Sequence, residues 1–234
     1  MIKITSIVQS YEEPHLEKNE LLTKIQSKIP NFRDLAIFNQ SYIRPNVIYR
    51  SASPIEHQTP ELLQNFKDLG IRSIIDLRSA VEIGYSSYND DFVNSFNYYW
   101  VHIDISMPPE VLLREGKTEL SFYKQFCWYT LYYNKAQIRR IFNILSQEEN
   151  YSTIIHCFAG RDRTGITSCL ILLLLNAPEP NIIQDYLETD EYTLSEDMEY
   201  IFDKVEEEGG IKKYLLSCGL QEDTLDRMIT QLHP

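Results

Sequence analysis

The segment from His156 to Gly165 constrains the fold of this 234-residue chain more than any other feature. Its sequence is HCFAGRDRTG; the apolar run Tyr151–Ile155 precedes it, and an apolar stretch over Gly165–Leu175 continues from it. The first run predicts a buried strand and the second a helix, so the segment is a strand–loop–helix turn. Such a turn directs successive backbone N–H groups and a helix N-terminus toward one point. The sequence therefore predicts a cradle for a phosphate dianion.

Strand and helix patterns alternate along most of the chain. This alternation predicts an α/β fold with a central, mostly parallel sheet flanked by helices, and a helical C-terminal part. We expect a single domain over residues 1–234, with a core over about 31–176, an acidic helical tail over about 179–234, and a candidate cap over the site between 104 and 147. The strands are expected at Val47–Arg50, Ile71–Leu77, Tyr98–Ile103 and Tyr151–Ile155, and the main helices at 21–29, 60–69, 120–133, 138–145, 165–175 and 194–205.

The formal net charge of −12 is unevenly distributed. Residues 179–234 contain 15 acidic and 4 basic side chains, whereas the first 178 residues contain 19 and 18. The acidity disfavours nucleic acid as a partner and stable association with an anionic membrane. The predicted phosphate cradle lies in the nearly neutral part, and we expect the acidic tail to present a solvated face.

Several features favour a reduced, cytoplasmic protein. Residues 1–20 mix charges and contain no secretory signal, and the apolar run Ile166–Leu175 is too short to span a bilayer. The four cysteines are widely spaced and form no disulfide or zinc framework, and no histidine has the spacing of a metal ligand. We expect Cys127, Cys169 and Cys218 to be buried as small apolar side chains.

Each residue type in the loop suits one step of phosphate chemistry. Cys157 lies among backbone amides and near two arginines, which favours the nucleophilic thiolate. Arg163 can bind two phosphoryl oxygens at once, and Gly160 allows the backbone to turn sharply. The Thr164 hydroxyl could donate a hydrogen bond to the Cys157 sulfur. We expect His156 to fix the loop through a hydrogen bond rather than to act as a base.

The pattern His-Cys, five residues, Arg-Thr-Gly resembles the phosphate loop of cysteine-dependent protein tyrosine and dual-specificity phosphatases. Five upstream blocks resemble the bacterial PtpB/LipA-like branch of these enzymes. The resemblance covers roughly residues 31–176, and the acidic tail contributes no motif to it. The blocks are NFRDL at 31–35, IRP at 43–45, YRS at 49–51, LGI at 69–71 and DLRS at 76–79.

The resemblance implies phosphate monoester hydrolysis through a phosphocysteine, with neither metal nor cofactor. It assigns catalysis to Cys157, Asp162 and Arg163, with His156 and Thr164 in support. Arg161 departs from the branch, which usually has lysine there, and the different geometry of arginine puts activity on phosphoinositides in doubt. The phosphate-binding residues that it implies are Phe158, Ala159, Gly160, Arg161, Asp162 and Arg163.

Two aspartates are candidates for the general acid that protonates the leaving group. Asp162 lies inside the loop, where the similar branch has the aspartate proposed for this role. Asp104 follows the strand Tyr98–Ile103, where dual-specificity enzymes often place their acid. We favour Asp162 by this analogy. The structural alternatives are a partner of Arg161 for Asp162 and a helix cap for Asp104.

Other polar and aromatic residues have both structural and functional interpretations. Asp76 and Arg78 end a predicted parallel strand, but an internal salt bridge is the favoured interpretation. Arg50 and Ser51 are likewise favoured as structural residues. Helical spacing favours the core over a substrate pocket for four aromatic side chains: Tyr123, Phe126, Trp128 and Tyr132.

We favour a phosphotyrosine-containing protein or peptide as the substrate, with phosphoserine and phosphothreonine as further possibilities. The alternative substrate is a phosphoinositide or inositol polyphosphate, but the near-neutral core offers no broad basic surface for it. A third interpretation is a binding module that recognises phosphate without turnover. The intact set of Cys157, Asp162 and Arg163 argues against that interpretation.

Overall fold

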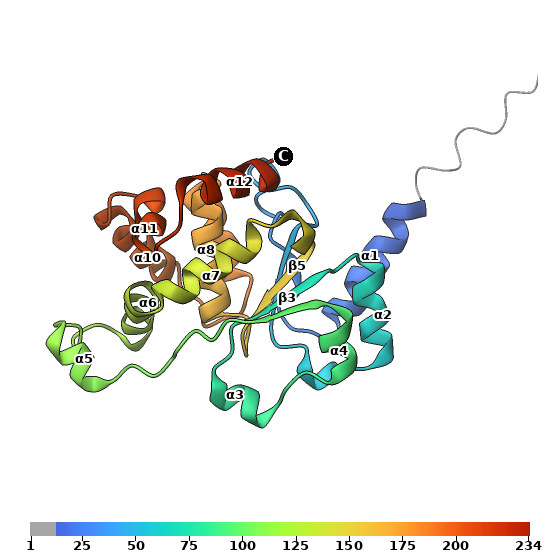
Figure 1. Ribbon diagram of the computed structural model, residues 1–234, viewed down its shortest axis with the longest axis horizontal. Coiled ribbons are helices and arrows are strands. Elements are labelled where there is room, and N and C mark those ends of the chain that lie inside the picture. The colour runs from blue at the N-terminus through green and yellow to red at the C-terminus, as the bar shows by residue number, and fades with distance from the viewer. Residues whose placement is uncertain (1–12) are drawn as a thin grey trace, which may run out of the picture.

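The computed structural model describes residues 13–234 and places helices on both faces of a five-stranded sheet (Figure 1). The strand order is β1-β2-β5-β3-β4, with β1 antiparallel to β2 and the other neighbours parallel. This arrangement confirms the predicted α/β fold with a mostly parallel sheet. The strands are β1 Arg33–Asp34, β2 Ile48–Ser51, β3 Ser73–Asp76, β4 Asn97–Trp100 and β5 Thr153–His156.

Neighbouring apolar residues in the strands point to opposite faces of the sheet and create two cores. Ile74 and Ile154 pack in one cluster, whereas Ile75 and Ile155 pack in the other. Both faces are therefore buried, as a parallel sheet requires.

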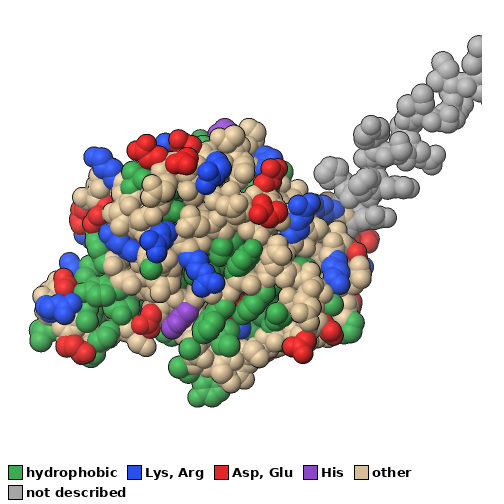
Figure 2. Space-filling view, in the orientation of Figure 1, with side chains coloured by type: hydrophobic (Ala, Val, Ile, Leu, Met, Phe, Trp, Pro, Cys, Tyr) green, Lys and Arg blue, Asp and Glu red, His purple; other side chains and the backbone are tan. Residues whose placement is uncertain are grey.

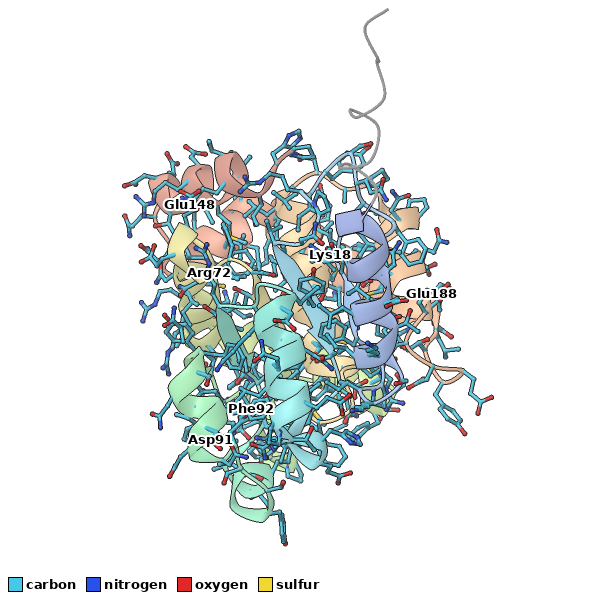
Figure 3. The ribbon with its side chains drawn as sticks, turned by 90° about the vertical axis from the view of Figure 1, so that its right-hand side faces the viewer. Lys18, Arg72, Asp91, Phe92, Glu148 and Glu188 are labelled. Atoms are coloured by element: carbon cyan, nitrogen blue, oxygen red, sulfur yellow. The ribbon has the colours of Figure 1, made fainter. Side chains whose placement is uncertain are left out.

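The smaller core lies under the N-terminal helices. Figure 3 shows α1 and α2 side by side over this face. As the sequence predicts, α2 begins at Thr59-Pro60: the Thr59 hydroxyl accepts a hydrogen bond from the N–H of Leu62, and Pro60 takes the first helical position. The helices on this side are α1 Glu13–Gln26, α2 Pro60–Asp68 and α4 Asp90–Ser95.

The larger core joins the other face of the sheet to the remaining helices, including those of the acidic tail. Met198 and Leu215 lie in the same cluster as Ile155 and Leu170. The tail therefore packs onto the core, and its face toward the core also buries Asp185 and Asp197, which differs from the expectation of solvated acidic residues. These helices are α6 Phe122–Tyr133, α7 Lys135–Leu145, α8 Asp162–Leu174, α9 Glu179–Leu187, α10 Ser195–Glu207, α11 Ile211–Ser217 and α12 Glu222–Leu232.

Two short helices that the apolar pattern does not predict follow the carboxyl ends of β3 and β4. They are α3 Ala80–Tyr85 and α5 Pro109–Arg114, and hydrophobic side chains gather over both in Figure 2. Val81, Tyr85 and Leu113 are each more than two-thirds exposed. These helices show no periodic apolar face because they contribute little to either core.

Two expectations concern membranes and export. The structure contains, within residues 13–234, no helix with the length and apolar character that a bilayer crossing needs. The expectation that residues 1–20 contain no export signal falls mainly on residues 1–12, which lie outside the described residues.

Candidate active site

The cysteine loop, defined here as residues 157–163, joins the carboxyl end of β5 to the start of α8. Cys157 is 2% exposed. Arg161, Asp162 and Arg163 line a cavity of about 790 Å³, whose other walls come from the start of α6, the end of α9 and the start of α10. The predicted strand–loop–helix turn therefore opens toward a cavity large enough for an aromatic side chain. We call this the cavity side of the loop, and the side against β2 the sheet side.

Four consecutive N–H groups of the loop are available to a ligand. The backbone N–H groups of residues 158–161 have no hydrogen-bond acceptor among the described residues. The preceding carbonyls are held on the sheet side: Phe158 O accepts from Ser53 N at 2.9 Å, and Ala159 O accepts from Asn31 Nδ2 at 2.8 Å. Because C=O and the next N–H point in opposite directions across a trans peptide, these bonds turn the N–H groups of Ala159 and Gly160 away from the sheet side. This is the amide arrangement that binds oxyanions.

Gly160 fits closely against the end of β2. Its φ is 71°, which favours glycine, and a Cβ atom there would lie 2.4 Å from the carbonyl carbon and oxygen of Ser51 and 2.5 Å from Ala52 N. Arg50 Nη2 donates to Gly160 O at 2.9 Å. Arg50 and Ser51 thus contact the loop itself, through a side chain and a backbone respectively.

Arg163 is held by a carboxylate and still has one edge free. Glu82 accepts from Arg163 Nη1 at 2.6 Å and from Nη2 at 2.7 Å, and Leu77 O accepts from Nη1 at 3.4 Å. A guanidinium has five N–H donors, so Nε–H and the second N–H of Nη2 remain. These two lie parallel along one edge and have no acceptor among residues 13–234. That edge can bind two phosphoryl oxygens at once.

Glu82 itself is fixed at the start of α3. Its backbone N–H donates to the Ser79 hydroxyl, and its carboxylate accepts from Ser79 N at 2.6 Å, which completes a capping box. Burial alone would raise the pKa of Glu82, but the hydrogen bonds from Arg163 and Ser79 lower it to about 2. Glu82 is therefore ionised at neutral pH, and it holds Arg163 in place.

His156 is buried and neutral. Burial lowers its pKa and outweighs the opposing effect of the nearby Asp76 carboxylate. Nδ1 lies 2.9 Å from Cys157 O, which can only accept, so Nδ1 carries the proton. Nε2 then accepts from the Tyr88 hydroxyl at 2.9 Å. This arrangement fits the expected role of His156 in fixing the loop.

The Thr164 hydroxyl is buried without a hydrogen-bond partner among the described residues. It therefore makes no hydrogen bond to the Cys157 sulfur, although it lies at the start of α8 beside the loop. An unpaired buried hydroxyl is costly, so this donor is available for a group that arrives during the reaction.

Both candidate acids have partners, in different surroundings. Asp162 lines the cavity and accepts from Arg161 Nε at 3.0 Å, while Arg161 Nη1 also reaches Asp190 at 3.5 Å. The Asp104 carboxylate accepts from Ser106 N at 2.8 Å within a turn, and it is not among the residues that line the cavity. Asp162 is therefore the candidate that shares the cavity with Arg163.

A buried carboxylate also lines this cavity. Asp197, at the start of α10, is 7% exposed and accepts long hydrogen bonds from Leu194 N at 3.3 Å and from the Tyr186 hydroxyl at 3.5 Å. Burial raises its pKa, and the charges of Glu196 and Asp162 add to this effect. The acidic C-terminal segment thus contributes a wall of the cavity.

Of the other residues that the sequence offers as site candidates, some form structural contacts and some line the cavity. Asp76 accepts from Arg78 Nε and Nη2 in a buried ion pair, which is the internal salt bridge expected from the sequence. Phe126 packs in the larger core, as its helical spacing favours, and Tyr123 packs against that core, but both residues also line the cavity. Trp128 packs in a separate cluster with Leu112 and Tyr129, and Tyr132 packs against that cluster.

Sequence reasoning misses Glu82 and Asp185, the two carboxylates that hold arginines beside the loop. Glu82 has a detectable signal, because Ser79 and Glu82 have the spacing of a capping box. Asp185 has no such signal, because its partner Arg50 is 135 positions away in the chain.

Comparisons with known proteins agree with these observations. Residues 25–233 match a family described as "Tyrosine phosphatase family". Over 123 residues the chain is 27% identical to a tyrosine-protein phosphatase of Nostoc commune. This match covers 50% of this chain and 40% of that protein. Over 172 residues it is 24% identical to a putative tyrosine-protein phosphatase of Cupriavidus necator, with 70% and 61% covered. The chain thus matches between 40% and 61% of the length of these relatives, and the family match includes the acidic C-terminal helices.

Proposed function

The chain belongs to the tyrosine phosphatase family, and from this premise we propose that it hydrolyses phosphate monoesters of tyrosine in a protein or peptide through a phosphocysteine intermediate. The observation that carries the proposal is the free edge of Arg163 beside a loop with four unpaired backbone N–H groups. Together they offer six N–H donors to one tetrahedral dianion. Such preorganised donors stabilise the charge that develops on phosphoryl oxygens in the transition state.

The reaction has two balanced steps. The Cys157 thiolate attacks phosphorus, an S–P bond forms, and the P–O bond to the leaving phenol breaks. Water then attacks the phosphocysteine, the S–P bond breaks, and inorganic phosphate leaves with the thiolate restored. The Thr164 hydroxyl, which has no partner among the described residues, is the proposed hydrogen-bond donor to the sulfur as it leaves in the second step.

Asp162 is the proposed proton donor to the leaving phenol. Its place in the cavity lining beside Arg163 supports this role, and the turn that occupies the Asp104 carboxylate argues against Asp104. In the second step the same carboxylate accepts a proton from the attacking water. Replacing Asp162 with Asn is expected to slow hydrolysis of esters with poor leaving groups far more than Asp104→Asn does; the reverse order would assign the acid to Asp104.

The charge of the cavity favours a singly phosphorylated peptide over a polyphosphate. The three cations that line the cavity already contact carboxylates: Arg161 contacts Asp162 and Asp190, Arg163 contacts Glu82, and Lys124 contacts Glu196. A second phosphate group would therefore meet an acidic wall. The aromatic side chains of Tyr123, Phe126 and Tyr186 suit a phenyl ring instead.

A cytoplasmic location forms part of the proposal. All four cysteines are free and buried in the fold, which suits a reducing compartment.

Hydrolysis of para-nitrophenyl phosphate in excess EDTA tests the reaction class. We expect turnover that vanadate inhibits competitively and that Cys157→Ser abolishes. Retained activity in Cys157→Ser, or activity that requires added metal, would refute the mechanism. Phosphate release from a phosphotyrosine peptide and from a phosphoinositide at equal concentration tests the substrate class, and faster release from the phosphoinositide would support the alternative.

A further inference from the structure

The carbonyl of Gly160 is held by a buried ionic cluster on the sheet side of the loop. Arg50, 1% exposed, donates through Nη2 to Gly160 O at 2.9 Å and through Nη1 to Asp185 Oδ2. Arg33 donates through Nε to the other carboxylate oxygen of Asp185 at 3.0 Å. Thr189 Oγ1 accepts from both arginines. The cluster connects β1 and β2 with α9 and with the segment just after it.

The charges of this cluster do not balance. Two guanidinium groups share a single carboxylate, and Asp185 is 2% exposed. Burial and the charge of Arg50 lower the pKa of Arg33, which reports repulsion between the two arginines. Asp185 therefore carries the only negative charge that holds both cations by direct contact among the described residues. Without it, each arginine would repel the other in a water-poor environment.

The position of Arg50 decides where one N–H group of the loop points. The N–H of residue 161 is opposite the Gly160 carbonyl across a trans peptide, so Arg50 turns that N–H away from the sheet side. Phe158 O and Ala159 O are held by a backbone N–H and by an uncharged amide, respectively. Only the Gly160 carbonyl depends on a side chain that itself needs a counter-charge.

We propose that Asp185, in the acidic C-terminal segment, is a positioning residue for oxyanion binding and acts through Arg50 on the Gly160 carbonyl. The inference rests on the proposed function, because it concerns the loop that would bind the transferred phosphate. Its consequence is that the C-terminal helices are part of the catalytic unit, since α9 supplies the carboxylate.

The test compares the affinity for an oxyanion with the stability of each variant. Asp185→Asn removes the charge at constant size, and Arg50→Lys cannot donate to Asp185 and Gly160 in the same geometry. For both variants we expect the inhibition constant of vanadate to rise at least about tenfold and kcat to fall, because the transition state is bound by the same N–H groups. Thermal melts of each variant establish that it is folded.

Asn150→Ala is the matched control. Asn150 is a buried polar hub that contacts Ser73, Asn97 and Tyr99 just before β5, at the edge of the sheet opposite the loop. We expect this variant to lose thermal stability, with an inhibition constant for vanadate within twofold of the wild-type value. If it weakened vanadate as much as Asp185→Asn does, general destabilisation would explain the effect, and the proposal would fail.

Asp185→Glu covers the case in which Asp185→Asn does not fold. It retains the charge but lengthens the side chain by one methylene, so we expect a folded protein with a several-fold weaker vanadate affinity. Folded variants at both positions that bind vanadate like the wild type would overturn the inference. Failure of the proposed function is a separate result, because the wild-type chain would then neither hydrolyse para-nitrophenyl phosphate nor gain thermal stability from vanadate.

Discussion

The cysteine loop lies between two buried arginine–carboxylate pairs that use the same chemistry with different outcomes. On the cavity side, Glu82 occupies one edge of the guanidinium of Arg163, which lines the cavity, and the other edge has no acceptor among the described residues. On the sheet side, Arg50 directs its terminal nitrogens to Asp185, Thr189 and the loop, and its Nε is buried.

This difference shows that the residue type does not decide which arginine binds phosphate. Both are nearly buried and both are paired with a carboxylate. Only Arg163 has parallel N–H donors that a ligand can reach, so it is suited to bind the substrate, whereas Arg50 is suited to shape the loop. Variants on the two sides should therefore separate transition-state binding from the stability of the fold.

The largest effect is expected for Arg163→Lys on the cavity side. Lysine can still pair with Glu82, so the protein should fold, but it offers no parallel pair of donors to the phosphoryl oxygens. We expect kcat/KM for para-nitrophenyl phosphate to fall about 100- to 1,000-fold. Arg78→Lys is the control, because it alters another buried arginine–carboxylate pair, whose residues do not line the cavity, and it should affect stability much more than turnover. Equal losses of activity in both variants would show that the loss of a buried arginine, rather than the loss of phosphate contacts, explains the effect.

A smaller effect on activity, joined to a loss of stability, is expected for Gly160→Ala on the sheet side. The new methyl group would collide with the backbone of Ser51 and Ala52, which cannot move without shifting β2. Overpacking of this kind destabilises a protein by about 1–3 kcal/mol. Gly70→Ala is the control, since its φ is also positive (80°) but no atom lies within 4 Å of the added Cβ. Thermal melts and kcat/KM together would reveal whether loop and strand move as one unit.

The smallest effect concerns pH and His156, which is sealed beneath the loop. Burial lowers the pKa of His156 in the folded state. Below about pH 6.5 this histidine therefore binds a proton in the unfolded chain but stays neutral in the folded protein. Stability should therefore be complete above pH 6.5 and fall as the pH decreases, by up to about 1.4 kcal/mol per pH unit. His156→Gln should flatten this dependence in urea titrations between pH 6.5 and 5. An unchanged slope would assign the acid sensitivity to other groups.

The sequence predicts those parts of the structure that depend on local patterns. The apolar strands, the Thr59-Pro60 helix start and the turn around Cys157 are all within a few residues of their observed positions, because burial and capping leave periodic signals. Helix α3 is not predicted from the apolar pattern, because its side chains are not buried. The role of Glu82, which lies in this helix, is therefore not predicted either. The cluster of Arg33, Arg50 and Asp185 could not be predicted, because a long-range ion pair leaves no spacing to read.

In the acidic C-terminal segment, too, the sequence predicts the general character of the surface but not the residues at the site. Its charge predicts a solvated surface, and most of its acidic residues are indeed exposed. Asp185 and Asp197 are the two that are buried, and they lie beside the loop and the cavity. The net charge of a segment does not show which of its acidic residues are buried. It is therefore a better guide to solubility than to the residues of a site.

Three successive carbonyls anchored on the sheet side have one more consequence, which concerns selectivity. A loop that is already shaped before any ligand arrives loses little conformational entropy on binding, so it should accept any tetrahedral oxyanion of suitable size. Inorganic phosphate is such an ion and is also the product, so the shaped loop favours product inhibition. Discrimination between substrates then depends on the cavity walls. Their aromatic and acidic side chains come from α6, α9, α10 and the segments beside these helices, and not only from the loop.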